Sequence, residues 1–152
     1  MTAPLLVIGV GNPSRGDDAL GPRFVDRASE ALGPEIAAGK IELLTDFQLQ
    51  IEHALDLVGR ARVVFVDASV DVAPPCAFAP IEAKRDESAT THALSPEAVL
   101  DTYRAVVGPN PPPAWVLAIR GERFELGEDL TPAARANLDA ALEVFLAEAR
   151  AS

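Results

Sequence analysis

The sequence predicts an α/β fold, a three-layer α/β/α sandwich around a twisted, mostly parallel sheet of about five strands. Two observations support this prediction. Nearly continuous apolar runs, typical of strands covered on both faces, alternate along the chain with segments of helical periodicity. The chain has 152 residues, which is enough to bury a core, so we expect a single domain over residues 1–152.

Apolar segments bounded by turn residues predict the strands. The first is apolar throughout, and the third is nearly so and ends at an aspartate, Asp67. Pro74, Pro75 and Pro80 place the fourth strand at an edge of the sheet, because proline cannot donate a ladder hydrogen bond. The predicted strands are Leu5–Val10, Ile41–Leu44, Ala61–Ala68, Cys76–Ile81 and Ala114–Ile119.

Helical spacing of apolar residues and start signals predict the helices. Gly21-Pro22 opens the first helix, and Gly33-Pro34 stops it. Ser95-Pro96 combines a capping serine with a proline in the first turn, and Thr131-Pro132 starts the last helix. A short helix is predicted from the buried stripe Ile51, Ala54, Leu55 and Val58, and the helix after Ser95 from Val99, Leu100, Tyr103, Val106 and Val107.

Charge and composition exclude several classes of protein. The net charge is −10 and the isoelectric point about 4.5, and such a surface repels nucleic acid and anionic membranes. The single cysteine, Cys76, excludes an internal disulfide and a cysteine-rich zinc site. Because the sequence shows neither a signal peptide nor a membrane span, we expect a cytoplasmic protein.

The stretch from Leu5 to Gly21 is the most informative, because it is a strand, a glycine-rich turn and a helix start. A dinucleotide fingerprint requires a third glycine where Ser14 stands. A P-loop requires a lysine and a hydroxyl residue where Asp17 and Asp18 stand, and an aspartate repels phosphate. The loop is therefore a poor phosphate cradle and is better suited to present a carboxylate to a cation.

Several side chains are candidates for chemistry at the carboxyl ends of the strands. Asp17 and Asp18 are adjacent and face different ways, so we expect one to cap the following helix and the other to be free. His53 lies off the apolar stripe of its helix and is expected on the surface. Asp18, Asp67 and His92 together would suit a divalent first-row metal with open coordination positions.

Residues 9–21, Gly-Val-Gly-Asn-Pro-Ser-Arg-Gly-Asp-Asp-Ala-Leu-Gly, resemble the signature of the [NiFe]-hydrogenase maturation endopeptidases. Val66-Asp67-Ala68 and the segment Thr91-His92-Ala93-Leu94-Ser95 match the next two landmarks of that family in order and spacing. The resemblance covers nearly the whole chain. It implies one α/β/α domain that removes a C-terminal extension from the precursor of the hydrogenase large subunit after nickel insertion.

The resemblance also implies roles for individual residues. Asp18, Asp67 and His92 are the residues expected to contact nickel, which the substrate carries, and to take part in catalysis. Many members have Asp-Gly-Gly-Thr after the second strand, where this chain has Thr45-Asp46-Phe47-Gln48-Leu49-Gln50. This segment is expected to read the substrate tail through Asp46 and Gln48. The departure resembles proteases that serve soluble, NAD-linked hydrogenases.

Two other functions remain open at this point. One is a non-catalytic domain that binds a nucleotide or another small ligand. The other is a metal-dependent chaperone that binds the same subunit without cutting it.

If the protein is the protease, water would hydrolyse the scissile peptide, with a carboxylate as general base or with the metal polarising the carbonyl. The protease itself is expected to be a monomer.

Overall fold

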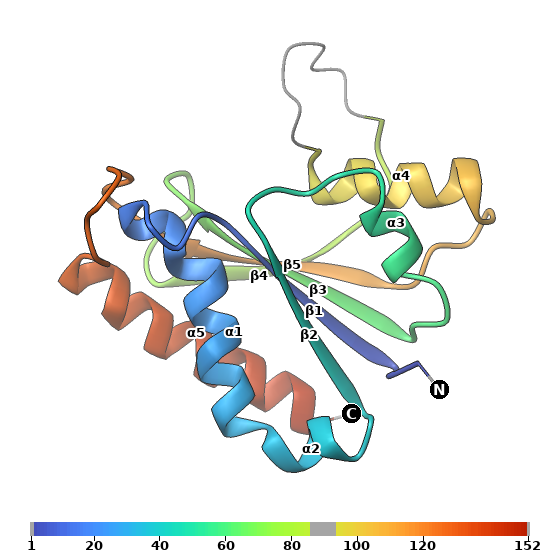
Figure 1. Ribbon diagram of the computed structural model, residues 1–152, viewed down its shortest axis with the longest axis horizontal. Coiled ribbons are helices and arrows are strands. Elements are labelled where there is room, and N and C mark those ends of the chain that lie inside the picture. The colour runs from blue at the N-terminus through green and yellow to red at the C-terminus, as the bar shows by residue number, and fades with distance from the viewer. Residues whose placement is uncertain (1, 86–93, 152) are drawn as a thin grey trace.

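A computed structural model describes residues 2–85 and 94–151. The predicted fold class is confirmed, because a sheet of five strands lies between two layers of helices (Figure 1). The strands are β1 (Leu5–Val10), β2 (Ile41–Asp46), β3 (Arg62–Ser69), β4 (Cys76–Ile81) and β5 (Ala114–Arg120). The helices are the 3-10 helix η1 (Gly16–Ala19), α1 (Leu20–Ala31), α2 (Gly33–Ala37), α3 (His53–Asp56), α4 (Pro96–Val106) and α5 (Pro132–Ala151).

The strand order is β2-β1-β3-β5-β4. β2, β1, β3 and β5 are parallel, and β4 pairs with β5 in the antiparallel direction at the edge that its prolines predicted. The chain runs outward from β1 to β2 and then returns to place β3 on the other side of β1. Strand order therefore reverses between β1 and β3, which is where ligands bind in open α/β sheets.

Alternate residues of β1 face the two helical layers, because side chains point to opposite faces of a strand. Leu5 and Val7 pack in a core with α1 and α5. Leu6, Ile8 and Val10 pack in the other core with α3 and α4. Figure 1 shows α1 and α5 on one side of the sheet and α3 and α4 on the other.

The helix starts are well predicted, but two buried stripes are not. The Ser95 hydroxyl accepts the N–H of Ala98 at 3.1 Å, as expected of a cap. At the end of α4, however, Val106 and Val107 are exposed. A new short helix, α2, also begins at Gly33, where the first helix was predicted to stop.

Of the buried stripe predicted for α3, Ala54 is confirmed and the other three residues are wrong. Ile51, Leu55 and Val58 are exposed, and Leu57 is buried in their place. The physical reason is that α3 spans only His53–Asp56, so a few apolar residues do not fix which face turns inward. Within the described residues, no helix is both long and apolar enough to cross a membrane.

Candidate functional site

The carboxyl ends of β1 and β3 meet at the point where strand order reverses. Gly9 pairs with Val66 across these two strands, so the glycine loop that follows Val10 begins beside Asp67, which still lies within β3 and pairs with Ala118 of β5. The structure thus confirms that these two candidate segments come together. Figure 1 shows the loops that follow β1, β2, β3 and β5 rising from the same edge of the sheet.

The glycines of the loop allow close approach of the backbone. Gly11 has φ +145°, and a Cβ there would lie 1.9 Å from the carbonyl oxygen of Asp18. At Gly21 a Cβ would lie 2.3 Å from the Val10 carbonyl oxygen. Glycine is therefore needed to fold the loop back on Asp18 and to seat α1 against β1.

The backbone N–H groups of residues 11–18 are already donated inside the protein, apart from Pro13, which has none. A phosphate cradle needs several free N–H groups that converge on one point. This loop offers no such set, so the geometry supports the expectation that it is a poor phosphate site. The acceptors are Asp46 O for Gly11, Asp18 Oδ2 for Asn12, Asn12 Oδ1 for Ser14, Asn12 O for Arg15, Glu128 O for Gly16, Arg123 O for Asp17 and Arg15 O for Asp18.

Asp17 is fully buried and holds a distant loop. Its carboxylate accepts the N–H groups of Glu122 at 2.7 Å, Arg123 at 3.2 Å and Thr131 at 2.8 Å, and the Thr131 hydroxyl at 2.9 Å. Burial raises the pKa of this carboxyl, but the hydrogen bonds from Thr131, Glu122 and Arg123 outweigh burial, and the pKa is lowered.

The expectation that one aspartate of the pair caps the following helix is wrong. Neither η1 nor α1 has a capping hydrogen bond from a side chain. Asp17 instead binds the β5–α5 loop, residues 121–131. The two aspartates do differ in role, as expected, since the Asp18 carboxylate accepts the N–H of Asn12 through Oδ2 at 2.8 Å.

The ionisation of Asp67 is strongly perturbed. Burial raises its pKa to about 7, the N–H of Ala68 partly offsets this, and the charge of Asp18 raises it further. Asp18 and Asp67 are therefore close enough to interact electrostatically. Within the described residues, Asp18 Oδ1 and Asp67 Oδ2 receive no hydrogen bond.

His92, the third predicted member of the metal-binding set, lies outside the described residues. Residues 2–85 and 94–151 contain no group of three or more histidine, cysteine or acidic side chains able to hold a metal ion. Leu94 donates its N–H to the carbonyl of Leu49, in the segment that follows β2, at 3.1 Å. The role of His92 stays a prediction.

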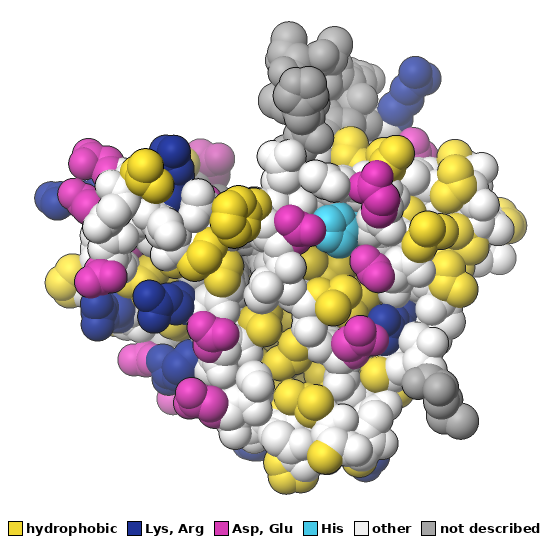
Figure 2. Space-filling view, viewed as in Figure 1, with side chains coloured by type: hydrophobic (Ala, Val, Ile, Leu, Met, Phe, Trp, Pro, Cys, Tyr) yellow, Lys and Arg dark blue, Asp and Glu magenta, His cyan; other side chains and the backbone are white. Residues whose placement is uncertain are grey.

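Asp46 and Gln48, the predicted substrate-binding residues, follow the carboxyl end of β2. Asp46 Oδ2 lies 3.4 Å from Nε2 of His53, and a histidine lies among acidic side chains on this face of the molecule (Figure 2). The N–H of Gln50 donates to Nδ1 of the same ring at 2.9 Å. Gln48 is half-buried.

The expectation that His53 is a surface residue is wrong, because only 8% of it is exposed. Its hydrogen bond to Gln50 and its contact with Asp46 satisfy the buried ring, so it anchors the turn that carries Gln48. Sequence reasoning missed both this anchor and the role of Asp17. A local signal for Asp17 is lacking, because its partner Thr131 is 114 positions away.

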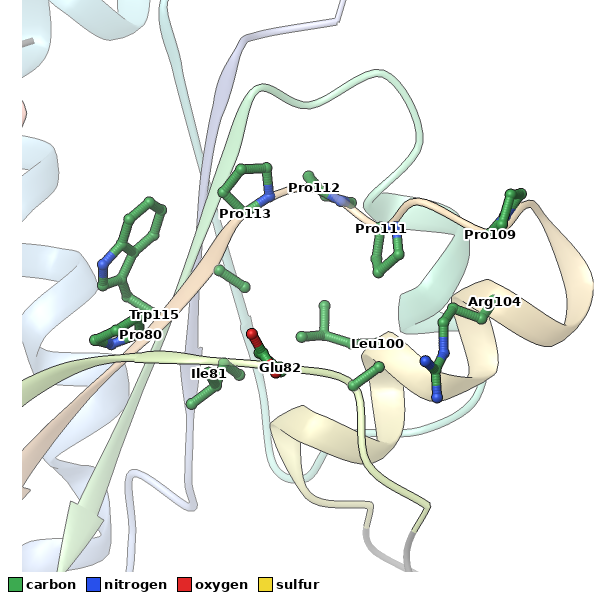
Figure 3. A pocket seen from close by; sticks show the side chains of 12 residues that line it. Pro80, Ile81, Glu82, Leu100, Arg104, Pro109, Pro111, Pro112, Pro113 and Trp115 are labelled. Atoms are coloured by element: carbon green, nitrogen blue, oxygen red, sulfur yellow. The ribbon is translucent and has the colours of Figure 1, made fainter.

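A hollow of about 450 Å³ lies at the opposite edge of the sheet, where β5 begins (Figure 3). Prolines line much of it, together with Trp115, and Arg104 and Glu82 are its charged residues. It lacks a pair of carboxylates. The edge that carries Asp18 and Asp67 is therefore the candidate active site.

Comparison with protein-family models finds no match, and comparison with curated proteins finds none either. Solved structures do match. The hydrogenase maturating endopeptidase HybD from E. coli is 27% identical with a TM-score of 0.72, over 99% of this chain and 93% of that one. An endopeptidase from Escherichia coli is 27% identical with a TM-score of 0.69, over 97% and 91%.

A more distant likeness supports the fold alone. The [NiFe] hydrogenase maturation protease HycI from Thermococcus kodakarensis KOD1 is 20% identical with a TM-score of 0.66, over 94% of this chain and 90% of that one. The two likenesses at 27% identity confirm the resemblance recognised from residues 9–21 and the assignment of the chain as a peptidase.

Proposed function

We propose that this peptidase, a hydrogenase maturation endopeptidase by fold and signature, removes the C-terminal extension of a [NiFe]-hydrogenase large-subunit precursor after nickel has been inserted. The observation that carries the proposal is the pair of carboxylates, Asp18 and Asp67, at the point where strand order reverses. They interact electrostatically, and each has an oxygen without a donor in the described part of the chain.

The nickel of the precursor is the proposed recognition element. Two carboxylate oxygens and an imidazole nitrogen form a donor set that suits a divalent first-row metal and leaves positions for the ligands that the precursor supplies. Asp18, Asp67 and His92 would form this set. A precursor without nickel would then lack the contact that holds its tail for cleavage.

Hydrolysis needs a group that takes a proton from water. A general base works best with a pKa near the working pH, and in the protein without nickel burial raises the pKa of Asp67 to about 7, which makes Asp67 a candidate base when its carboxylate does not hold the metal. When bound, nickel would add the ability to polarise the scissile carbonyl.

The segment that follows β2 is the proposed reader of the tail. Asp46 stands at the end of β2, exposed, and its Oδ1 accepts the N–H of Phe47 at 2.7 Å. His53 and the buried Leu49 hold the turn from beneath. This segment, which lacks the glycines of many relatives, supports a precursor of the soluble, NAD-linked class.

The test is the mass of the precursor's C-terminus before and after incubation with the protease. Wild-type protein is expected to release the tail from nickel-loaded precursor and to leave nickel-free precursor intact. Asp18→Asn, Asp67→Asn and His92→Ala should each stop processing. Asp71→Asn changes an exposed carboxyl of the β3–β4 loop and serves as the matched control.

The other two functions give different results in the same setting. A metal-dependent chaperone would bind the precursor and leave its mass unchanged. A nucleotide-binding domain would release heat when titrated with nucleotide. We expect no such heat, because the N–H groups of the glycine loop are donated within the protein and two aspartates repel phosphate.

A further inference from the structure

The two edges of the sheet differ in how they are protected against pairing with a further strand. β2 ends the strand order on one side and β4 on the other. Pro80 lies within β4 and removes a main-chain donor from that strand, whereas β2 contains neither proline, glycine nor lysine. Figure 1 shows β2 at the front edge of the sheet, and Figure 2, in the same view, shows hydrophobic side chains along its course. The edge of β2 is therefore open to another strand.

The main-chain groups of β2 alternate in direction. The carbonyl of Lys40 accepts the N–H of Leu5 at 3.3 Å, and the carbonyl of Asp46 accepts the N–H of Gly11 at 3.0 Å, so even-numbered residues face β1. The N–H and C=O groups of Leu43 and Thr45 consequently point outward. Within residues 2–85 and 94–151 these outward groups have no hydrogen-bond partner. A row of such groups matches the backbone of an extended polypeptide.

This free edge leads to the candidate active site. Thr45 pairs with Gly9, and Gly11, which is bonded to Asp46, lies against Asp18. Because neighbouring strands lie about 4.8 Å apart, a strand added to β2 would lie about 12 Å from the line between β1 and β3. About four residues of extended chain span this distance. A polypeptide cut between β1 and β3 can therefore cross the end of β2 and pair with its outer edge.

A hollow of about 440 Å³ lies beside the same edge. Ile36, Ile41 and Leu43 give it apolar walls, and Ser29 of α1 also lines it. Ile41 and Leu43 pack on the side of the sheet that α1 covers, so the hollow lies on that side. Side chains of an added strand would alternate between the two faces of the sheet, and every second one would point toward this hollow. Its walls favour an apolar side chain.

We propose that the tail of the precursor binds as an added strand along the free edge of β2, antiparallel to it. The inference rests on the proposed function and deepens it. The nickel-bearing body of the precursor must lie at Asp18 and Asp67, beyond the carboxyl end of β2. The tail follows the scissile bond, so it crosses the segment after β2 and then runs from Asp46 toward Ile41, with an apolar side chain in the hollow. A second copy of this chain is a poor occupant, because two net charges of −10 repel each other.

Thr45→Pro tests the main-chain pairing through the rate of tail removal at increasing concentrations of nickel-loaded precursor. The Thr45 side chain is exposed, and proline removes an outward N–H without taking a hydrogen bond from β1. We expect KM to rise about fivefold, the loss of one hydrogen bond, with kcat unchanged. The control substrate is the same precursor with its tail cut to four residues, for which Thr45→Pro and wild type should have the same KM.

Amide exchange tests the pairing in the wild-type protein, without any substitution. The isotope-labelled protein is titrated with a synthetic peptide that has the sequence of the tail. Exchange at Leu43 and Thr45 should slow on binding, because their outward N–H groups gain acceptors. Exchange at Glu42 and Leu44, whose N–H groups face β1, should not change.

Ser29→Phe tests the hollow, because the larger side chain would fill the space proposed for a side chain of the tail. It should raise KM for the full-length precursor. Glu30→Phe is the matched control, since it adds the same side chain at the next exposed position of α1, outside this hollow. It should leave KM unchanged.

Several results would overturn the strand-addition inference. They are unchanged exchange at Leu43 and Thr45, a KM for Thr45→Pro that equals wild type or rises equally with the short tail, and equal effects of Ser29→Phe and Glu30→Phe. A dimer of the free protein that Thr45→Pro dissociates, measured by sedimentation, would assign the edge to a second copy instead. All of these leave the proposed function intact, provided that the wild-type protein releases the tail. If the wild-type protein does not cleave the precursor, the proposed function fails, and the inference with it.

Discussion

Replacing Asp67 by asparagine should make the free protein more stable at alkaline pH. Burial is the main reason that the pKa of this carboxyl rises from 3.8 to about 7, and the charge of Asp18 adds to it. An asparagine has nearly the same shape, and its amide oxygen can still accept the N–H of Ala68, which Asp67 accepts at 2.8 Å. The substitution therefore removes a buried charge and keeps the contact.

The size of the effect follows from the two pKa values. Between pH 3.8 and about 7 the folded protein keeps a proton that the unfolded chain has released. The free energy of unfolding of the wild type therefore falls as pH rises through this window, by about 2.5 kcal/mol between pH 5 and pH 8. The unfolding free energy of Asp67→Asn does not decrease in this way. The decrease in the wild type corresponds to about 5–10 °C in Tm for a domain of this size.

The assay is chemical denaturation of both proteins at pH 5 and pH 8, with a chelator present to remove bound metal. The quantity to compare is the difference in unfolding free energy between Asp67→Asn and the wild type at each pH, because titrating groups that do not interact with Asp67 contribute equally to both. Asp71→Asn, at an exposed site, should show no such change. If Asp67→Asn and wild type lose stability in parallel from pH 5 to pH 8, the pKa of Asp67 is not raised and the reasoning is refuted.

Three further substitutions test the residues that hold the glycine loop and the segment after β2 in position. Asp17→Ala should lower the free energy of unfolding by about 3 kcal/mol or more, because buried N–H groups lose their acceptor. The midpoint of denaturant unfolding measures this loss, and an unchanged midpoint would contradict the prediction. In wild type the stabilisation from Asp17, whose pKa is lowered, should persist at neutral pH and disappear as pH falls below about 4. Gly11→Ala should abolish processing, because its Cβ meets the Asp18 carbonyl; normal cleavage would show that the loop tolerates a side chain. His53→Ala should lower the free energy of unfolding by about 1–2 kcal/mol, since a buried ring bonded to Gln50 and facing Asp46 is lost. Thermal denaturation measures this loss, and an unchanged stability would support a surface position for His53 instead.

The fold was largely predictable because its strands are long apolar runs and its helix starts carry strong local signals. β1 and β3 are buried on both faces, which their composition indicated. Which face of the short α3 is buried could not be predicted, because Ile51, Leu55 and Val58 suit a buried stripe as well as an exposed one. Tertiary packing selected Leu57 and His53 for the inner face.

The site was predictable where the topology decides it. Asp18 follows the central strand β1, and Asp67 lies near the carboxyl end of the neighbouring parallel strand β3, so their meeting follows from the alternation of strands and helices. The hydrogen bonds of Asp17 could not be predicted, since its carboxylate accepts from N–H groups that lie more than one hundred positions later in the sequence. The environment of His53 depends on the turn from Asp46 to Gln50, whose course local patterns do not specify.

The reach of Asp17 across the sequence has a consequence for the order in which the protein is completed. Its partners lie 105 to 114 positions downstream, so a growing chain that has emerged from the ribosome only as far as β4 does not yet contain the donors that this carboxylate needs. The glycine loop can settle only after the β5–α5 loop has been synthesised, and contacts of such long range form late. A nascent chain therefore becomes a competent peptidase only near the end of its synthesis, and deletion of the final helix with its preceding loop should leave the N-terminal signature present but unformed.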